Sequence, residues 1–413
     1  MVNVMQTPDQ PSPAPGQTRR LQLPEFVAML ALLFATVAFS IDAMLPALTE
    51  IGQELSPANS NRAQLVLMAF VAGMGVGTAL SGPISDAIGR KPTIISGSVI
   101  YILASAGAIV ADSMTLLLVL RFIQGLGASG PRIAGTALVR DLYAGREMAR
   151  ITSFVMMIFI LIPAVAPAVG ELVMNAAGSW RGVFGAFVVF GLIGALWVGL
   201  RQPETLAPAN RVPLRAGRLR QAAHEVLSNR QVMLCTLILT LGFGQMFALL
   251  SSSEQLFVHS YGQGQHFTKW FALMALLSGF GTVLNARYVM RLGMRRIARW
   301  AYAMQVVVAA VTLLLIAGGL VSGRAEFAVF FIWAVSVFFM AGVTFGNLNA
   351  IAMQNMPHLA GMTASIVAAL SSLGAVVIAA PVGMAYSGPP TPMILAALIC
   401  SATAWILMAR LRD

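Results

Sequence analysis

Twelve long apolar runs follow one another along the chain, and they restrict its fold more than any other feature. Each has about 20 residues, the length that an α-helix needs to cross the hydrocarbon core of a bilayer. Because no water there can satisfy the peptide groups, such segments must span as helices. The sequence therefore predicts an all-α polytopic membrane protein with twelve transmembrane helices. The runs lie near residues 25–48, 63–82, 93–111, 115–138, 152–173, 182–200, 231–252, 268–286, 298–318, 327–350, 362–384 and 391–408.

The composition agrees with a membrane protein and argues against several other classes. Hydrophobic residues make up 58% of the 413 residues and charged residues 10%, an apolar excess that no soluble fold needs. Cys235 and Cys400 lie inside apolar runs, so we interpret them as packing residues rather than as a disulfide or metal pair. The four His residues lie in loops without ligand spacing, and no motif pairs a nucleophile with a base. We expect neither an enzyme nor a bound metal or cofactor.

One long polar connection divides the runs into two sets of six. It covers residues 201–230, and we interpret it as a cytoplasmic linker. The sequence then predicts an N-terminal six-helix bundle over residues 25–200 and a C-terminal one over residues 231–413. Residues 1–24 start with a stretch rich in Pro, Gln and Ser that has no signal-peptide core, so we predict a disordered cytoplasmic tail.

Lys and Arg residues are concentrated in the loops on one side of the predicted membrane. With the N-terminus in the cytoplasm, only Arg62, Arg181, Lys269 and Arg324 fall in loops on the outer side. Because Lys and Arg favour cytoplasmic loops, we predict that both termini are cytoplasmic. We interpret the net charge of +11 as a sign of this orientation in a lipid bilayer, and we expect no nucleic-acid partner.

A charged turn after the second run recurs in the second half of the chain. The second copy has Gly293 at 204 residues from Gly89, about half the chain, and Met290 in the place of Asp86. Two related halves of six helices are typical of many secondary transporters. The first copy contains Gly82, Asp86, Gly89, Arg90 and Lys91.

Acidic residues inside the runs are candidates for function, because a charge at a helix centre costs about 2.5–3.5 kcal/mol. Asp42 lies in the outer third of the first run. It is either an interfacial acid that reaches water or a carboxylate that faces a central cavity and binds and releases a proton. Glu171, near the outer end of the fifth run, is either an acid that reaches water or a second protonatable site.

The fourth run carries two arginines, Arg121 and Arg132. Eleven residues at about 100° each place them within about 20° of the same helix face, about 16 Å apart along the axis. Asp42 and Arg121 fall at similar depths, so they can pair when the cavity is closed to the outside. A purely structural ion pair is the alternative role for Arg121.

A set of polar and flexible side chains is predicted to line a substrate cavity together with Arg132. Three of them belong to the seventh run and its exit, where a wet helix end explains the acidic one equally well. The set consists of Arg132, Gln124, Gln245, Met246 and Glu254.

Several of these motifs resemble the major facilitator superfamily of transporters. The turn from Gly82 to Lys91 is similar to the loop between the second and third helices of that family. The segment that begins at Arg121 resembles its helix-4 motif, in which the Arg is implicated in proton coupling. The fifth run resembles its antiporter motif through Pro163, Pro167 and Gly170, and departs from that pattern at Ala166 and Glu171.

The resemblance narrows to one drug-resistance group within the superfamily. The segments around Asp42, Asp141 and Glu204 are similar to the bicyclomycin and chloramphenicol (Bcr/CflA) group. The resemblance implies the major facilitator fold, with two pseudo-symmetric six-helix bundles, in the inner membrane. It also implies a cytoplasmic latch in which the charged turn meets the cytoplasmic end of helix 11. The predicted latch residues are Gly82, Asp86, Gly89, Arg90, Lys91, Asp141 and Gly361.

These observations predict a proton-coupled secondary transporter that exports small hydrophobic compounds by alternating access, as a proton antiporter. A proton-coupled importer of a metabolite remains an alternative. A membrane receptor or scaffold that transports nothing is an alternative from another class. We expect a monomer whose partners are a small-molecule substrate and protons.

Overall fold

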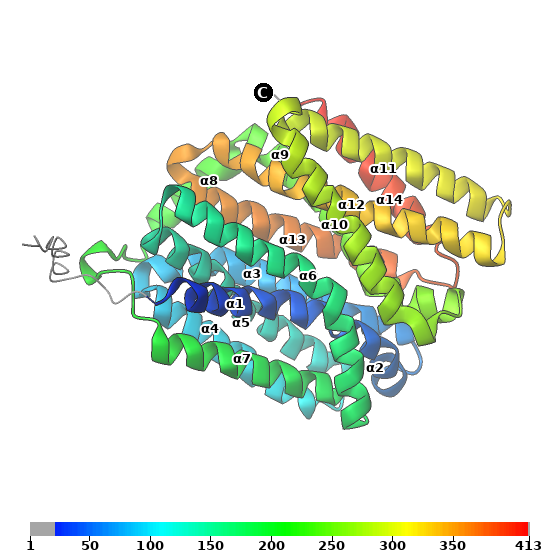
Figure 1. Ribbon diagram of the computed structural model, residues 1–413, viewed down its shortest axis with the longest axis horizontal. Helices are drawn as coiled ribbons and strands as arrows, with labels where there is room; N and C mark the ends of the chain where they lie inside the picture. Colours follow the sequence, from blue (N-terminus) through cyan, green and yellow to red (C-terminus); the bar gives the residue numbers. More distant parts are fainter. Residues whose placement is uncertain (1–20, 412–413) are drawn as a thin grey trace, which may run out of the picture.

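The computed structural model describes residues 21–411, apart from the side chains of residues 149, 153, 156, 158–160, 216 and 218. The predicted tail therefore lies outside the described residues as far as residue 20. Between residues 21 and 411 the regular structure is helical throughout, without a β-strand (Figure 1). The helices are α1 (Leu23–Asp42), α2 (Leu48–Leu55), α3 (Gln64–Ile88), α4 (Arg90–Ile109), α5 (Met114–Leu142), α6 (Gly145–Ala177), α7 (Arg181–Arg201), α8 (Ala216–Ser228), α9 (Arg230–Gln255), α10 (Phe267–Leu292), α11 (Met294–Ala317), α12 (Gly323–Gln354), α13 (Ala360–Met384) and α14 (Thr391–Met408).

Twelve of these helices correspond to the twelve apolar runs. Within the described residues, eleven segments are long and apolar enough to cross a membrane. The remaining long helix, α6, contributes the described apolar part Leu161–Ala177. The all-α, multi-span architecture that the sequence predicts is confirmed.

Two helices, α2 and α8, are shorter than the others. α2 follows α1 after a 3₁₀ turn at Leu45–Ala47, and α8 lies in the predicted linker, where it packs against α9 and α13. We call the end of the molecule with α8 and residues 86–91 the linker end. The opposite end, with residues 43–63 and 251–262, is the far end. The predicted domain boundaries stay predictions.

Helix packing in the two halves follows one pattern. In the first half α3 and α4 pack against α5, α4 against α7, and α1 against α6. In the second half α10 and α11 pack against α12, α11 against α14, and α9 against α13. Each pair in the first half corresponds to a pair six spans later in the second half. The two contacts between the halves, α3 with α13 and α10 with α6, correspond to each other in the same way. The pairings therefore have the two-fold pseudo-symmetry that the repeated turn predicts.

The repeated turn has the same backbone conformation in both copies. Gly89 separates α3 from α4 with φ of 114°, and Gly293 separates α10 from α11 with φ of 81°. Residues with a Cβ rarely adopt this positive φ, so glycine is what lets one helix end and the next begin without a loop.

Close helix contacts hold the first half together. A Cβ atom on Gly125 of α5 would lie 2.0 Å from the carbonyl oxygen of Phe70 on α3, and one on Gly73 of α3 would lie 1.9 Å from that of Phe122. The absence of side chains at these two positions lets the backbones of α3 and α5 touch, as small residues do between membrane helices.

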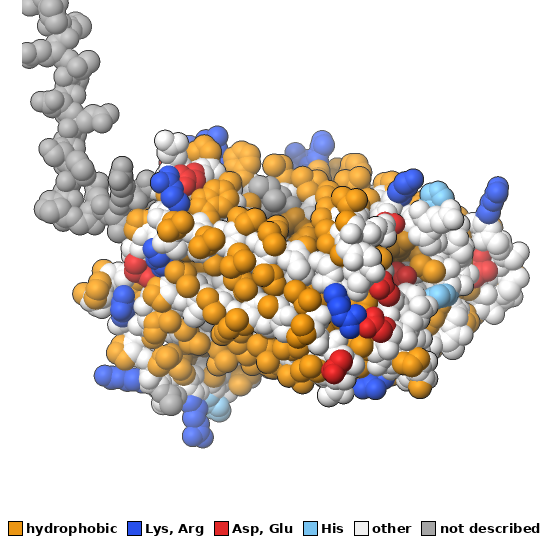
Figure 2. Space-filling model, turned by 90° about the horizontal axis from the view of Figure 1, so that it is seen from below, with side chains coloured by type: hydrophobic (Ala, Val, Ile, Leu, Met, Phe, Trp, Pro, Cys, Tyr) orange, Lys and Arg blue, Asp and Glu red, His pale blue; other side chains and the backbone are white. Residues whose placement is uncertain are grey.

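The outer surface suits a bilayer. Figure 2 shows hydrophobic side chains across the middle of one face, with charged side chains gathered toward its two ends. Many exposed large side chains are apolar, among them Leu103, Leu172, Leu196, Phe280 and Ile332. An apolar surface of this extent is stable in contact with lipid.

Candidate functional site

A cavity of about 650 Å³ lies between the two halves and contains the candidate site. Most of its wall is apolar, with aromatic and Met side chains from both halves. Two charged residues, Asp42 and Arg132, are part of that wall. Other lining residues are Ile41, Met74 and Pro163 from the first half, and Met246, Phe271, Phe338, Phe345 and Asn349 from the second.

Asp42 is the last residue of α1 and is only 5% exposed. Its carboxylate has no hydrogen bond or ion pair with any other described residue. The helix breaks directly after it, and the carbonyl oxygen of Ala43 lies 2.0 Å from where a Cβ on Gly170 of α6 would be. The predicted helix-5 motif thus contributes twice: Gly170 allows α6 to touch the end of α1, and Pro163 lines the cavity.

Arg132 places a cation in the same cavity. Its guanidinium contacts the Met74 sulfur atom on α3 at 4.0 Å and has no carboxylate partner among the described residues. The cavity therefore combines an apolar wall with one acidic and one basic side chain, neither of which has an ionic partner in the part of the chain that the structure describes. Such a site suits apolar molecules and leaves a carboxylate available for a proton.

Arg121 faces α3 as Arg132 does, but it lies inside the first half, away from the cavity. It is completely buried and donates hydrogen bonds to the Val66 carbonyl at 3.1 Å and to the Ser40 carbonyl at 3.0 Å. The Phe70 ring lies 4.6 Å from its guanidinium carbon. The structure does not form the proposed pair with Asp42, because neighbouring backbone carbonyls and an amide satisfy the guanidinium. A role of Arg121 in proton coupling stays a prediction.

Three predicted cavity residues lie elsewhere. Gln124 accepts a hydrogen bond from Arg121 at 2.6 Å and donates one to Ser105 at 2.7 Å, so its amide is used inside the first half. Gln245 accepts one from Ser401 of α14 at 2.9 Å and faces the interior of the second half. Glu254 lies at the far end, where Thr49 donates to its carboxylate. Only Arg132 and Met246 of the predicted set line the cavity.

Glu171 is half-buried near the far end of α6 and is not among the cavity-lining residues. Neither of the two alternatives given for it is excluded by its position. A role in proton binding stays a prediction.

Hydrogen bonds between the two halves close the far end of the molecule. Sequence reasoning did not predict these contacts. Gln64 of α3 donates to the Gln255 side chain at 2.6 Å and accepts from Ser252 at 2.7 Å, both on α9. Asn61 donates to the carbonyl oxygens of Met384 at 3.2 Å and Tyr386 at 2.8 Å. The only available signal was the polar edge of the seventh run, whose partners lie almost 200 residues away.

The predicted latch residues meet at the linker end. Gly82, Asp86, Arg90, Asp141 and Gly361 line one cavity of about 670 Å³ between the charged turn and the start of α13. Arg90 donates to Asp141 at 3.0 Å and forms an ion pair with Asp86. The ionic contacts are thus within the first half, and contact with α13 is made by Gly82, where a Cβ would lie 3.3 Å from the Ser365 hydroxyl oxygen.

Glu204, which follows α7 at the start of the predicted linker, binds this turn, a role that sequence reasoning missed. Its carboxylate accepts from the backbone N–H groups of Arg90 at 3.0 Å and Lys91 at 3.1 Å, which begin α4. An acid at this position satisfies unpaired N–H groups and favours the positive end of the helix dipole. Lys91 completes the contact by donating to the Gly199 carbonyl at 2.7 Å.

A family model described as Major Facilitator Superfamily matches residues 30–379. The chain belongs to the major facilitator superfamily. The solved structure of a D-xylose–proton symporter has the same fold as this superfamily member, with a TM-score of 0.76 over 95% of this chain and 98% of that one at 12% identity. The human organic anion transporter MFSD10 covers 95% of the chain with a TM-score of 0.65 at 18% identity. Superfamily membership identifies a transporter and not an enzyme.

Curated relatives of this superfamily member include drug-resistance proteins. It is 28% identical over 349 residues to a bicyclomycin resistance protein homolog of Haemophilus influenzae, covering 83% of this chain and 84% of that protein. It is 28% identical over 361 residues to a chloramphenicol resistance protein of Pseudomonas aeruginosa, covering 84% and 81%. The multidrug resistance protein MdtL of Escherichia coli is 30% identical over 249 residues, covering 59% and 61%.

Proposed function

We propose that this transporter exports small hydrophobic compounds from the cytoplasm in exchange for protons. The observation that carries the proposal is the carboxylate of Asp42, which is buried in the cavity between the halves without an ionic partner. A buried acid without a counter-charge is costly when ionised, so a gain or loss of its proton changes the stability of any state that buries it. The drug-resistance relatives support the substrate class and the direction.

The arrangement of the two ends supports alternating access. The far end is closed by the Gln64 and Asn61 hydrogen bonds, whereas the central cavity reaches Ile133 and Ser365, which also line the linker-end cavity. We propose that the protein lies in the inner membrane with its linker end on the cytoplasmic side. The structure then represents a state that is closed to the outside. Protons enter from the far end in the opposite state and bind Asp42, and substrate leaves.

The first prediction concerns Asp42→Asn. Asn has nearly the same volume but cannot titrate, so we expect the variant to fold and to lose at least about 90% of transport driven by a pH gradient. The measurement is substrate-stimulated proton flux in proteoliposomes, with a panel of apolar antibiotics. Glu25→Gln is the matched control, because Glu25 lies at the other end of α1 and pairs with Arg201 at 2.8 Å, outside the cavity.

Undiminished proton-driven transport by Asp42→Asn would contradict the proposal. The direction of flux separates the alternatives: inverted vesicles accumulate substrate if the protein is an exporter and lose it if the protein is an importer. A receptor or scaffold would give no substrate-stimulated proton flux with wild-type protein.

A further inference from the structure

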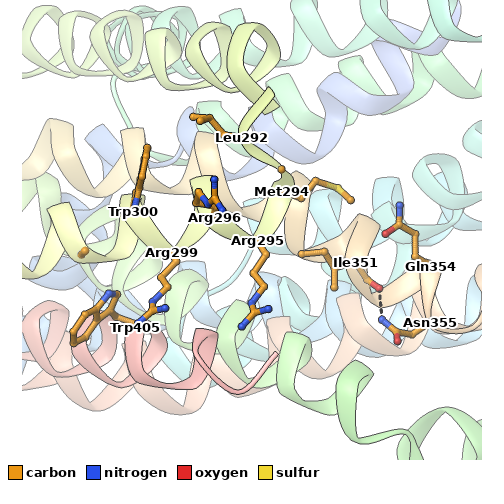
Figure 3. Close-up of a pocket in the computed structure, with 12 residues that line it drawn as sticks. Leu292, Met294, Arg295, Arg296, Arg299, Trp300, Ile351, Gln354, Asn355 and Trp405 are labelled. Atoms are coloured by element: carbon orange, nitrogen blue, oxygen red, sulfur yellow. Dashed lines mark hydrogen bonds between the residues drawn. The ribbon is translucent and has the colours of Figure 1, made fainter. Parts of the chain in front are cut away.

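A third cavity, of about 950 Å³, lies at the linker end of the second half, away from the central cavity (Figure 3). It is formed where α10 turns into α11, beside the end of α12 and the last turns of α14. Its wall contains three arginines, two tryptophans and two amide side chains, which are Arg295, Arg296, Arg299, Trp300, Trp405, Gln354 and Asn355. We propose that this cavity binds the phosphate headgroup of an anionic glycerophospholipid.

Two arginines of this turn, Arg296 and Arg299, have no acid beside them among the described residues, unlike the arginine of the matching turn in the first half. There, Arg90 has Asp86 and Asp141 as ionic partners. In the second half, Met290 replaces the first acid, and neither Arg296 nor Arg299 has a carboxylate within ion-pair distance among residues 21–411. The repeat thus keeps the backbone shape of the turn, and the positive charges of Arg296 and Arg299 are left for an external anion.

Two of the three arginine side chains, Arg299 and Arg295, are positioned by contacts with α14 and its end. The guanidinium carbon of Arg299 lies 5.6 Å from the centre of the Trp405 ring, and Figure 3 shows the two side chains next to each other. Arg295 donates to the Ala409 carbonyl at 3.4 Å, which links α11 to the end of α14. A planar guanidinium fixed against an aromatic ring retains N–H groups that bind phosphate oxygens.

An apolar stripe that faces the bilayer favours a lipid over a soluble anion. Trp300 is 57% exposed and begins a row of exposed side chains on one face of α11, spaced by three or four residues. The row continues toward the membrane centre through Met304, Val307, Val311 and Leu314. Trp at a membrane interface and basic residues beside it are a known pattern for lipid headgroups, and the stripe below gives the acyl chains a surface.

The test measures retention of lipid by the purified full-length protein. We expect native mass spectrometry to show more bound phosphatidylglycerol than phosphatidylcholine of the same acyl chains. In Arg296→Gln/Arg299→Gln, we expect retention of phosphatidylglycerol to fall about tenfold or more, because each arginine near the headgroup contributes to attraction. Arg287→Gln/Arg291→Gln is the matched control: it removes the same charge from the same turn at positions that do not line the cavity.

Any of the following results would overturn the proposal. Equal retention of the two lipids would show that the cavity does not select negative charge. Equal loss in the two double variants would show a general effect of charge near the membrane. Displacement of phosphatidylglycerol by inorganic phosphate at about millimolar concentration would assign the site to a soluble anion. If the double variant fails to fold, Arg296→Gln alone is the alternative, because Arg296 is exposed. This single variant is expected to reduce retention of phosphatidylglycerol about threefold, and unchanged retention would likewise overturn the proposal.

Discussion

At the scale of single residues, Arg121 and Arg132 show how one helix gives the same side chain two environments. Arg121 is enclosed by backbone carbonyls, the Gln124 amide and the Phe70 ring, whereas Arg132 faces a cavity that is otherwise almost apolar. A buried guanidinium with every partner in place is a structural element, and its loss leaves acceptors unsatisfied. For Arg132, which faces the cavity, we propose a direct effect on the ligand.

We therefore predict different effects for the same substitution at these two positions. Arg132→Gln is expected to leave the amount of folded protein unchanged and to raise export of cationic compounds relative to neutral ones about tenfold, because it removes a repulsive charge. Arg121→Gln is expected to reduce folded protein severely. Transport assays with a cationic and a neutral substrate, together with fluorescence-detected size-exclusion chromatography, measure both effects. Unchanged selectivity in Arg132→Gln would show that its side chain does not act on the substrate.

At the scale of elements, the sequence determined which helices form but not what covers each face. Helical spacing placed Arg121 and Arg132 on one face of α5, and both do contact α3. The same spacing cannot tell that α3 and α5 touch at Gly125 and thereby shut Gln124 inside the first half. That information lies in the packing of helices that are about 50 residues apart.

The contact between α3 and α5 provides a prediction about stability. Gly125→Ala is expected to lower the free energy of unfolding by about 1–3 kcal/mol or more, since the added methyl group would lie 2.0 Å from a backbone oxygen that cannot move away by itself. The measurement is thermal unfolding in detergent. Gly185→Ala in α7, where an added Cβ meets no atom within 4 Å, is the control and is expected to be neutral or slightly stabilising. Equal stability of the two variants would show that the helices separate at no cost.

At the scale of the whole molecule, the contacts between halves were the part least accessible to sequence reasoning. The hydrophobic runs, the repeated turn and the linker predict two bundles, and the structure agrees. The far-end closure depends on Gln64 meeting Gln255, two amides 191 residues apart that no local pattern connects. Glu254 was assigned to a cavity because it belongs to the polar edge of the seventh run, and the sequence does not reveal its partner, Thr49 in the other half.

The closure gives a prediction about conformational populations. Gln64→Leu removes two hydrogen bonds between the halves and leaves the facing amide and hydroxyl groups of α9 unsatisfied, so we expect the far end to open more often. Spin labels at Ala58 and Ser387, both exposed, report the distance across this end. We expect a longer-distance population to grow several-fold.

Gln305→Leu is the matched control for this variant, because Gln305 is equally buried but lies in α11, inside the second half. It should leave the distance distribution as in the wild type. A distribution that is the same in all three proteins would show that these amides do not hold the far end closed.

The unpaired carboxylate in the cavity also has an electrical consequence. If Asp42 carries one proton inward per cycle, the export of a neutral compound moves one net positive charge into the cell. A membrane potential of 100 mV then adds about 2.3 kcal/mol to the driving force. Export of a monovalent cation by the same cycle moves no net charge, so its accumulation ratio follows the pH gradient alone. A collapse of the membrane voltage thus weakens the export of neutral compounds but not of monovalent cations. The charge of the compound, and not a second mechanism, makes this difference.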